Sequence, residues 1–150
     1  MYKKSITHYI AKVVIDILFY LSIVCTCAIP ALTAPLIRLY PLSCNILLAY
    51  AVILTVSGAC CVYILFLLKQ MYKSLLVGNP FVDENVRHLR KMAVTCLIIG
   101  IIYVVKSVFL FTIATPIIAG IFLVGCLFCL TLKDLFKQAV NYKAENDLTI

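Results

Sequence analysis

The sequence predicts an all-α integral membrane protein with four transmembrane helices, and its composition and hydropathy pattern are the basis for this prediction. Of its 150 residues, 65% are hydrophobic and only 13% are charged, whereas roughly 25% of residues in soluble domains are charged. A helix needs about 20 mostly apolar residues to cross a bilayer. Four segments are long enough and apolar enough: residues 13–29, 45–68, 92–110 and 113–132. Together they predict a single domain that comprises residues 1–150.

The first of these segments follows a basic stretch, and this pattern also occurs in secretory signal peptides. Its apolar core is long for a signal peptide, and the small-residue cleavage point at Ala34 is followed by Pro35. We therefore interpret it as a retained first span, followed by an outer loop with the sequence PALTAPLIRLYPLSCN. The third and fourth segments are separated by a predicted tight outer turn around Thr112 to Pro116, since proline suits the first turn of a helix.

The distribution of basic residues predicts the orientation, because cytoplasmic loops retain lysine and arginine. One side of the predicted membrane carries only Arg38 and Lys106. The basic residues of the other side are Lys3, Lys4, Lys12, Lys69, Lys73, Arg87, Arg90, Lys91, Lys133, Lys137 and Lys143. We expect both termini to be cytoplasmic. The net charge of +7 then reflects this asymmetry and an attraction to the anionic lipid bilayer, so no direct nucleic-acid binding is expected.

Beyond each inner boundary the apolar residues change from continuous to helically spaced, which predicts short cytoplasmic extensions of all four helices. These extensions form either a short four-helix bundle or amphipathic segments that lie flat on the membrane. The segment GNPFVDENVRHLRK joins the second and third helices. We predict that Gly78 ends one helix, that Asn79 caps the next, that Pro80 is its first residue, and that Asp83 and Glu84 stabilise its positive end.

Seven of the eight cysteines lie within the predicted spans, and Cys44 lies at the outer edge. Cysteine packs as a small hydrophobic residue in such positions. Cys126 and Cys129 share one helix face, but the chain lacks the paired short Cys/His spacings of zinc sites. The other thiols expected at similar depth are Cys60, Cys61 and Cys96. We therefore predict no metal site and no cofactor.

Two charged residues lie within the spans, where ionisable groups are candidates for function. Asp16 is four residues after Lys12, so a local ion pair or snorkelling explains it. Lys106 lies near the outer boundary, and its long side chain can reach the headgroups. At 1.5 Å per helical residue, Asp16 and Lys106 differ in depth by about 15 Å. The only histidines, His8 and His88, lie in no catalytic or metal motif, and no catalytic residues are predicted.

Two short motifs carry a family resemblance. The first comprises Asn79, Pro80, Phe81, Asn85, Leu89 and Arg90, and the second comprises Glu145, Asn146, Asp147, Leu148, Thr149 and Ile150. The chain resembles over its full length a family of short bacterial membrane proteins, typified by YoaS of Gram-positive bacteria and classed as a domain of unknown function. The resemblance implies four helices in the bacterial cytoplasmic (inner) membrane and no established activity. Residues 141–144 depart from the more acidic sequence that often precedes the second motif.

Members of that family are commonly encoded beside a small helix-turn-helix regulator of the Cro type, so the resemblance implies such a regulator as partner. We expect a non-enzymatic membrane protein whose cytoplasmic helical platform, shaped by residues 79–90, binds this partner. Residues 145–150 either dock as an extended peptide or brace the platform. The alternative function is a small transporter or channel subunit that uses Asp16, Lys106 and the thiols; an enzyme is less well supported, and a homo-oligomer stays open.

Overall fold

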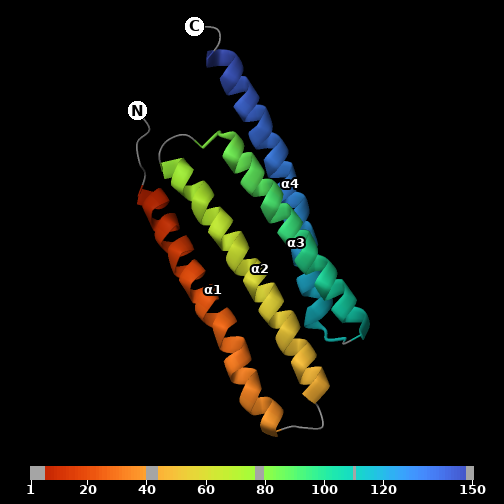
Figure 1. Ribbon diagram of the computed structural model, residues 1–150. Coiled ribbons are helices and arrows are strands. Elements are labelled where there is room, and N and C mark those ends of the chain that lie inside the picture. Colours follow the sequence, from red (N-terminus) through yellow and green to blue (C-terminus); the bar gives the residue numbers. More distant parts are fainter. Residues whose placement is uncertain (1–5, 40–43, 77–79, 110, 148–150) are drawn as a thin grey trace.

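The computed structural model consists of four long helices and describes residues 6–39, 44–76, 80–109 and 111–147 (Figure 1). The helices are α1 (Ile6–Leu39), α2 (Cys44–Leu76), α3 (Asp83–Phe109) and α4 (Ala114–Asp147). All four are long enough and apolar enough to cross a membrane. The prediction of an all-α chain with four helices suited to cross a membrane is therefore confirmed.

The helices form an open row in the order α1, α2, α3, α4. The α3–α4 pair packs most extensively and the α1–α2 pair comes next, whereas α2 and α3 share a smaller contact. Within the described ranges, α1 packs only against α2, and α4 only against α3 (Figure 1). The row differs from the four-helix bundle that the sequence suggested. In lipid, apolar side chains gain little from closing a bundle because acyl chains can cover them.

Helix α1 is longer than predicted, because it continues through Pro30 and Pro35 to Leu39. The outer loop predicted to begin at Pro30 is therefore wrong in its first ten residues. Each proline removes one backbone donor, but in hydrocarbon a loop would leave many more backbone groups unpaired. Within this part of α1, the Thr33 Oγ1 atom donates a hydrogen bond to the Pro30 carbonyl oxygen at 3.1 Å.

The predicted turn between the third and fourth spans is confirmed. Helix α3 ends at Phe109 and α4 begins at Ala114. The Thr115 amide donates a hydrogen bond to the Thr112 carbonyl oxygen at 2.8 Å. Pro116 lies in the first turn of α4, where its missing amide proton removes no helical hydrogen bond.

Most of the buried core lies where α3 packs between α2 and α4. One buried cluster consists of Leu67, Met92, Ala93, Cys96, Cys126 and Cys129, and the other consists of Ile99, Tyr103 and Ala119. Two glycines allow close helix packing. A Cβ atom at Gly58 would lie 2.7 Å from the Thr26 side chain of α1, and one at Gly100 would lie 2.9 Å from the Leu123 side chain of α4.

The start of α1, the end of α2, the start of α3 and the end of α4 all lie at one end of the row (Figure 1). We call this the basic end, because most of the described basic residues lie in these four segments. They are Lys12, Lys69, Lys73, Arg87, Arg90, Lys91, Lys133, Lys137 and Lys143. Arg38 and Lys106 lie near the opposite end, in the last turns of α1 and α3.

Helix α4 extends further than its neighbours at the basic end. The Phe81 ring, which precedes α3 in the chain, lies 5.6 Å from the Phe136 ring of α4. Phe136 is therefore level with the start of α3, and residues 137–147 continue for about 16 Å beyond it at 1.5 Å per residue. Figure 1 shows this segment, which we call the projecting end of α4, in dark blue beyond the green start of α3.

Candidate functional site

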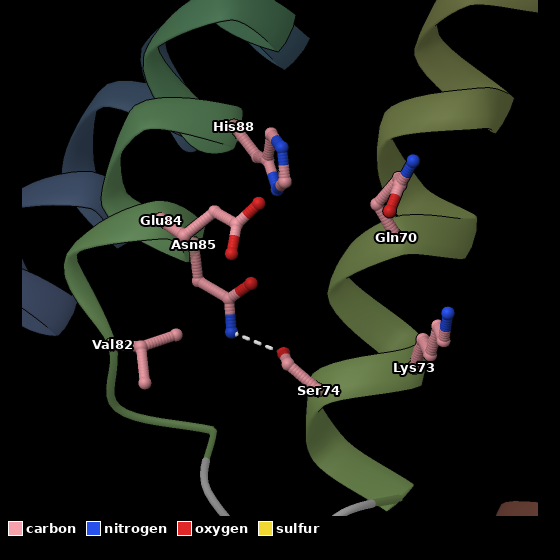
Figure 2. Close-up of a pocket in the computed structure, with 7 residues that line it drawn as sticks. All are labelled: Gln70, Lys73, Ser74, Val82, Glu84, Asn85 and His88. Atoms are coloured by element: carbon pink, nitrogen blue, oxygen red, sulfur yellow. Dashed lines mark hydrogen bonds between the residues drawn. The ribbon is translucent and has the colours of Figure 1, made fainter.

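A cleft of about 450 Å³ opens between α2 and α3 at the basic end (Figure 2). We call it the polar cleft, since most of its lining residues are polar or charged. They are Gln70, Lys73 and Ser74 from α2, Val82 from the connection, and Glu84, Asn85 and His88 from α3. In Figure 2 the side chains of α3 extend toward α2, and Asn85 meets Ser74 across the gap. These residues follow the last apolar turns of α2 and precede those of α3, so the helices present polar groups where they leave the predicted hydrocarbon.

Asn85 joins the two walls of the polar cleft. Its side chain is only 2% exposed, and its Nδ2 atom donates hydrogen bonds to the Ser74 Oγ atom and to the Pro80 carbonyl oxygen, each at 2.7 Å. The backbone amide of Asn85 donates a hydrogen bond to the Val82 carbonyl oxygen at 3.0 Å. A buried carboxamide has to be hydrogen-bonded to avoid a desolvation penalty. Asn85 therefore holds α2 near α3 and sets the path of the connection.

These bonds correct the predicted start of the third helix. Pro80, Phe81 and Val82 are not helical, and α3 begins at Asp83, so Pro80 is not its first residue. The predicted roles of Gly78 and Asn79 lie outside the described residues. Asn85 binds the Pro80 carbonyl group and thereby competes with a helical path for the chain before Asp83. Asp83 and Glu84 do lie in the first turn of α3, as predicted.

The remaining residues of the first motif have different surroundings. Leu89 is buried. Phe81 is partly exposed and packs against Phe136, so it connects the α2–α3 connection to α4. Arg90 is exposed on α3. The motif therefore combines residues that hold the helices together, led by Asn85 and Leu89, with residues that reach the surface.

Arg90 lines a second cleft of about 440 Å³, formed by α3 and Tyr63 of α2. We call it the basic cleft. Its lining residues are Tyr63, Arg87, Arg90, Lys91, Val94 and Thr95. None of them is acidic, and the ion pairs found among the described residues involve none of its three cations.

Asp16 has a different partner from the one predicted. Its Oδ1 atom lies 2.9 Å from the Nζ atom of Lys69 on α2, so the expected local pair with Lys12 is wrong. The Lys69 ammonium also lies 5.2 Å from the ring centre of Phe19 and 5.2 Å from that of Tyr20. The pair forms because α1 and α2 run side by side at this depth. It connects the two helices of the first hairpin.

Lys106 lies over two tyrosine rings and is partly buried. Its Nζ atom is 4.5 Å from the ring centre of Tyr50 and 5.5 Å from that of Tyr103. Among the described residues, Asp16 and Lys106 therefore have separate partners. The transporter alternative, which would use both charges, stays a prediction.

Three of the described thiols form part of the buried core, whereas Cys25 and Cys27 are exposed. Cys96, Cys126 and Cys129 lie in one cluster with Leu67 and Met92. The seven cysteines whose side chains are described are all free thiols. Among the described residues, no group of three or more His, Cys, Asp or Glu side chains is arranged to hold a metal ion.

The second motif lies partly on the projecting end of α4. Glu145, Asn146 and Asp147 are helical residues, so an extended conformation for the tail is wrong as far as Asp147. Glu145 is exposed. Leu148, Thr149 and Ile150 lie outside the described residues.

Polar contacts between the two hairpins were not found from the sequence. The hydroxyl groups of Ser57 and Tyr103 share a buried hydrogen bond at 3.3 Å, and those of Tyr50 and Thr112 share one at 3.5 Å. With the Asn85–Ser74 bond, they connect α2 to the second hairpin at three heights. Their sequence signal is the isolated hydroxyl in an apolar helix, which does not reveal its partner.

The family match agrees with this architecture. The model of the family described as "Protein of unknown function (DUF2975)" matches residues 7–150. The chain belongs to the DUF2975 family. The match to DUF2975 includes all four helices and nearly the whole chain, which confirms the resemblance to an uncharacterised family. No curated protein and no solved structure matches this DUF2975 member.

Proposed function

We propose that this chain is a non-enzymatic protein of the bacterial cytoplasmic membrane whose basic end faces the cytoplasm and binds a cytoplasmic protein. The asymmetry of charge supports the orientation, since the basic end collects most of the described lysine and arginine residues and such residues are retained on the cytoplasmic side. Reporter fusions to the two termini test it. Both fusions should be active only with a reporter that works in the cytoplasm, and activity of a periplasmic reporter at either terminus would contradict it.

The projecting end of α4 carries the proposal of a partner. Leu135, Ala139 and Tyr142 are spaced along one face of the helix, and we call them the α4 stripe. Leu135 is 55% exposed and Tyr142 is 66% exposed. Phe136 turns toward Phe81 instead, so the α4 stripe is on a different face from the contact with the connection. Apolar residues grouped on a surface outside the lipid favour a protein contact.

The partner that we propose is a small helix-turn-helix transcription regulator. The support for its identity is the family resemblance, which associates such regulators with these membrane proteins. The α4 stripe offers a short apolar helix face, which suits packing against a helical domain. Binding would hold the regulator at the membrane, and a signal would release it only if it favoured a state of the basic end with weaker affinity for the regulator.

Variants of the α4 stripe test this function. In cells, Leu135→Glu with Tyr142→Glu places two charges in the contact and should move the regulator from the membrane fraction to the cytosol. Asn141→Glu with Ala144→Glu is the matched control, because these two residues are exposed on the side of the same helix away from the α4 stripe. Membrane insertion of each variant is measured alongside. An unchanged membrane-bound fraction in the double variant, or an equal release by the control, would sink the proposal.

A further inference from the structure

We infer that the basic cleft binds the headgroup of an anionic phospholipid, with the phosphate at Arg87, Arg90 and Lys91 and an acyl chain beside Tyr63 and Val94. This inference requires only that the helices cross a membrane. It does not depend on the proposed protein partner.

Uncompensated charge is the first reason. The basic cleft contains three cations and no carboxylate. The neighbouring clefts differ, because Glu84 lines the polar cleft and Asp16 lines the cleft between α1 and α2. Arginine forms paired hydrogen bonds with phosphate oxygens, and basic pockets between transmembrane helices suit anionic headgroups.

The close spacing of three cations on one face of α3 also favours the binding of an anion. Arg87 is three residues before Arg90 and four residues before Lys91, and like charges at these spacings repel each other on a helix. Thr95 brings no negative charge to the basic cleft, and its Oγ1 atom donates to the Lys91 carbonyl oxygen at 2.9 Å. A bound phosphate would relieve the repulsion and would brace the start of α3.

The change from charged to apolar lining indicates a lipid rather than a soluble anion. Arg87 and Val94 are seven residues apart, which corresponds to about 10 Å along the helix. The predicted hydrocarbon boundary at residue 92 falls between them. Tyr63 forms the wall from α2, and tyrosine favours the membrane interface. A phospholipid has the same order of polarity, with a phosphate above a hydrocarbon chain.

Native mass spectrometry of the purified full-length protein in detergent tests this site. Phosphatidylglycerol and phosphatidylcholine with the same acyl chains are added in equal amounts, and the lipid retained by the protein is counted. We expect phosphatidylglycerol to be retained about tenfold or more in preference. In R87Q/R90Q/K91Q this preference should disappear. The matched control K12Q/K73Q/K137Q removes three exposed cations of the basic end that do not line the basic cleft, and its preference should change less than about twofold.

Two further measurements keep the outcome decisive. R87K/R90K retains the charge but not the paired geometry of arginine, and its preference should fall severalfold even if the triple variant misfolds. Circular dichroism verifies the helix content of each variant. Free inorganic phosphate should not displace the lipid. An equal loss of lipid preference in the control variant would show a diffuse attraction in place of a site. Displacement of the lipid by inorganic phosphate would show a site for soluble anions. An unchanged lipid preference in both R87K/R90K and the triple variant would overturn the inference.

Discussion

Replacing Asn85 with alanine tests whether the first family motif serves folding. The Asn85 side chain is 2% exposed and donates two hydrogen bonds of 2.7 Å, one to Ser74 of α2 and one to the Pro80 carbonyl oxygen. Asn85→Ala removes both bonds. It also leaves the Pro80 carbonyl group without this donor.

The magnitude follows from these contacts. Each hydrogen bond contributes about 1 kcal/mol net, and an acceptor left without its partner adds to the loss. We expect Asn85→Ala to lower the free energy of unfolding by about 2–3 kcal/mol. Ser74→Ala removes one of the two bonds and should cost about 1 kcal/mol. Because the two residues share a bond, the double variant should be more stable than the sum of the single effects predicts, by about 1 kcal/mol.

Reversible unfolding in mixed micelles, followed by circular dichroism as the denaturing detergent is increased, measures these energies. Gln70→Ala is the matched control, since Gln70 is exposed and lines the same polar cleft; it should change the free energy of unfolding by less than about 0.5 kcal/mol. The reasoning is refuted if Asn85→Ala is as mild as this control, or if the effects of Asn85→Ala and Ser74→Ala are simply additive.

The remaining predictions concern the contact between α1 and α2. Gly58→Ala would place a Cβ atom 2.7 Å from the Thr26 Oγ1 atom and should lower the free energy of unfolding by about 1–3 kcal/mol. Gly120→Ala is the control, because a Cβ atom at Gly120 would have nothing within 4 Å, and it should not lower the free energy of unfolding in the same titration. Equal effects of the two substitutions would contradict the close packing at Gly58. Lys69→Met should lower the melting temperature in detergent, because it leaves Asp16 without its ion-pair partner. Asp16→Asn added to it should restore most of this loss, and no restoration would mean that the pair contributes nothing.

The sequence was sufficient for the number of helices, because four long apolar segments admit few alternatives in lipid. It was also sufficient for the turn near Thr112, since Pro116 lies in the first turn of the helix that follows. The prediction that the first helix ends near Pro30 was wrong. Proline ends most helices in soluble proteins, but within hydrocarbon a proline in a helix costs less free energy than the unpaired backbone groups of a loop. The start of α3 was placed too early, because local capping patterns do not include a bond from Asn85 back to Pro80.

Partners between helices were beyond reach of the sequence. The sequence offered a local pair with Lys12 or snorkelling as explanations of Asp16, but its ion-pair partner is Lys69 of a neighbouring helix. Hydropathy also does not predict the order of the helices in the row, because every face of an apolar helix can contact either lipid or protein. The sequence showed Arg87, Arg90 and Lys91 only as separate cations. The structure places them on one face of α3, beside Tyr63 of α2.

The most direct test of the proposed function is site-specific photo-crosslinking in living cells. A photoreactive residue replaces Tyr142 on the α4 stripe, and in a second version it replaces Phe111, which is exposed at the opposite end of the row. We predict a covalent adduct with a helix-turn-helix regulator from position 142 and no such adduct from position 111. Adducts from position 142 with lipid or with copies of this chain only, or the same regulator adduct from both positions, would contradict a partner surface at the basic end.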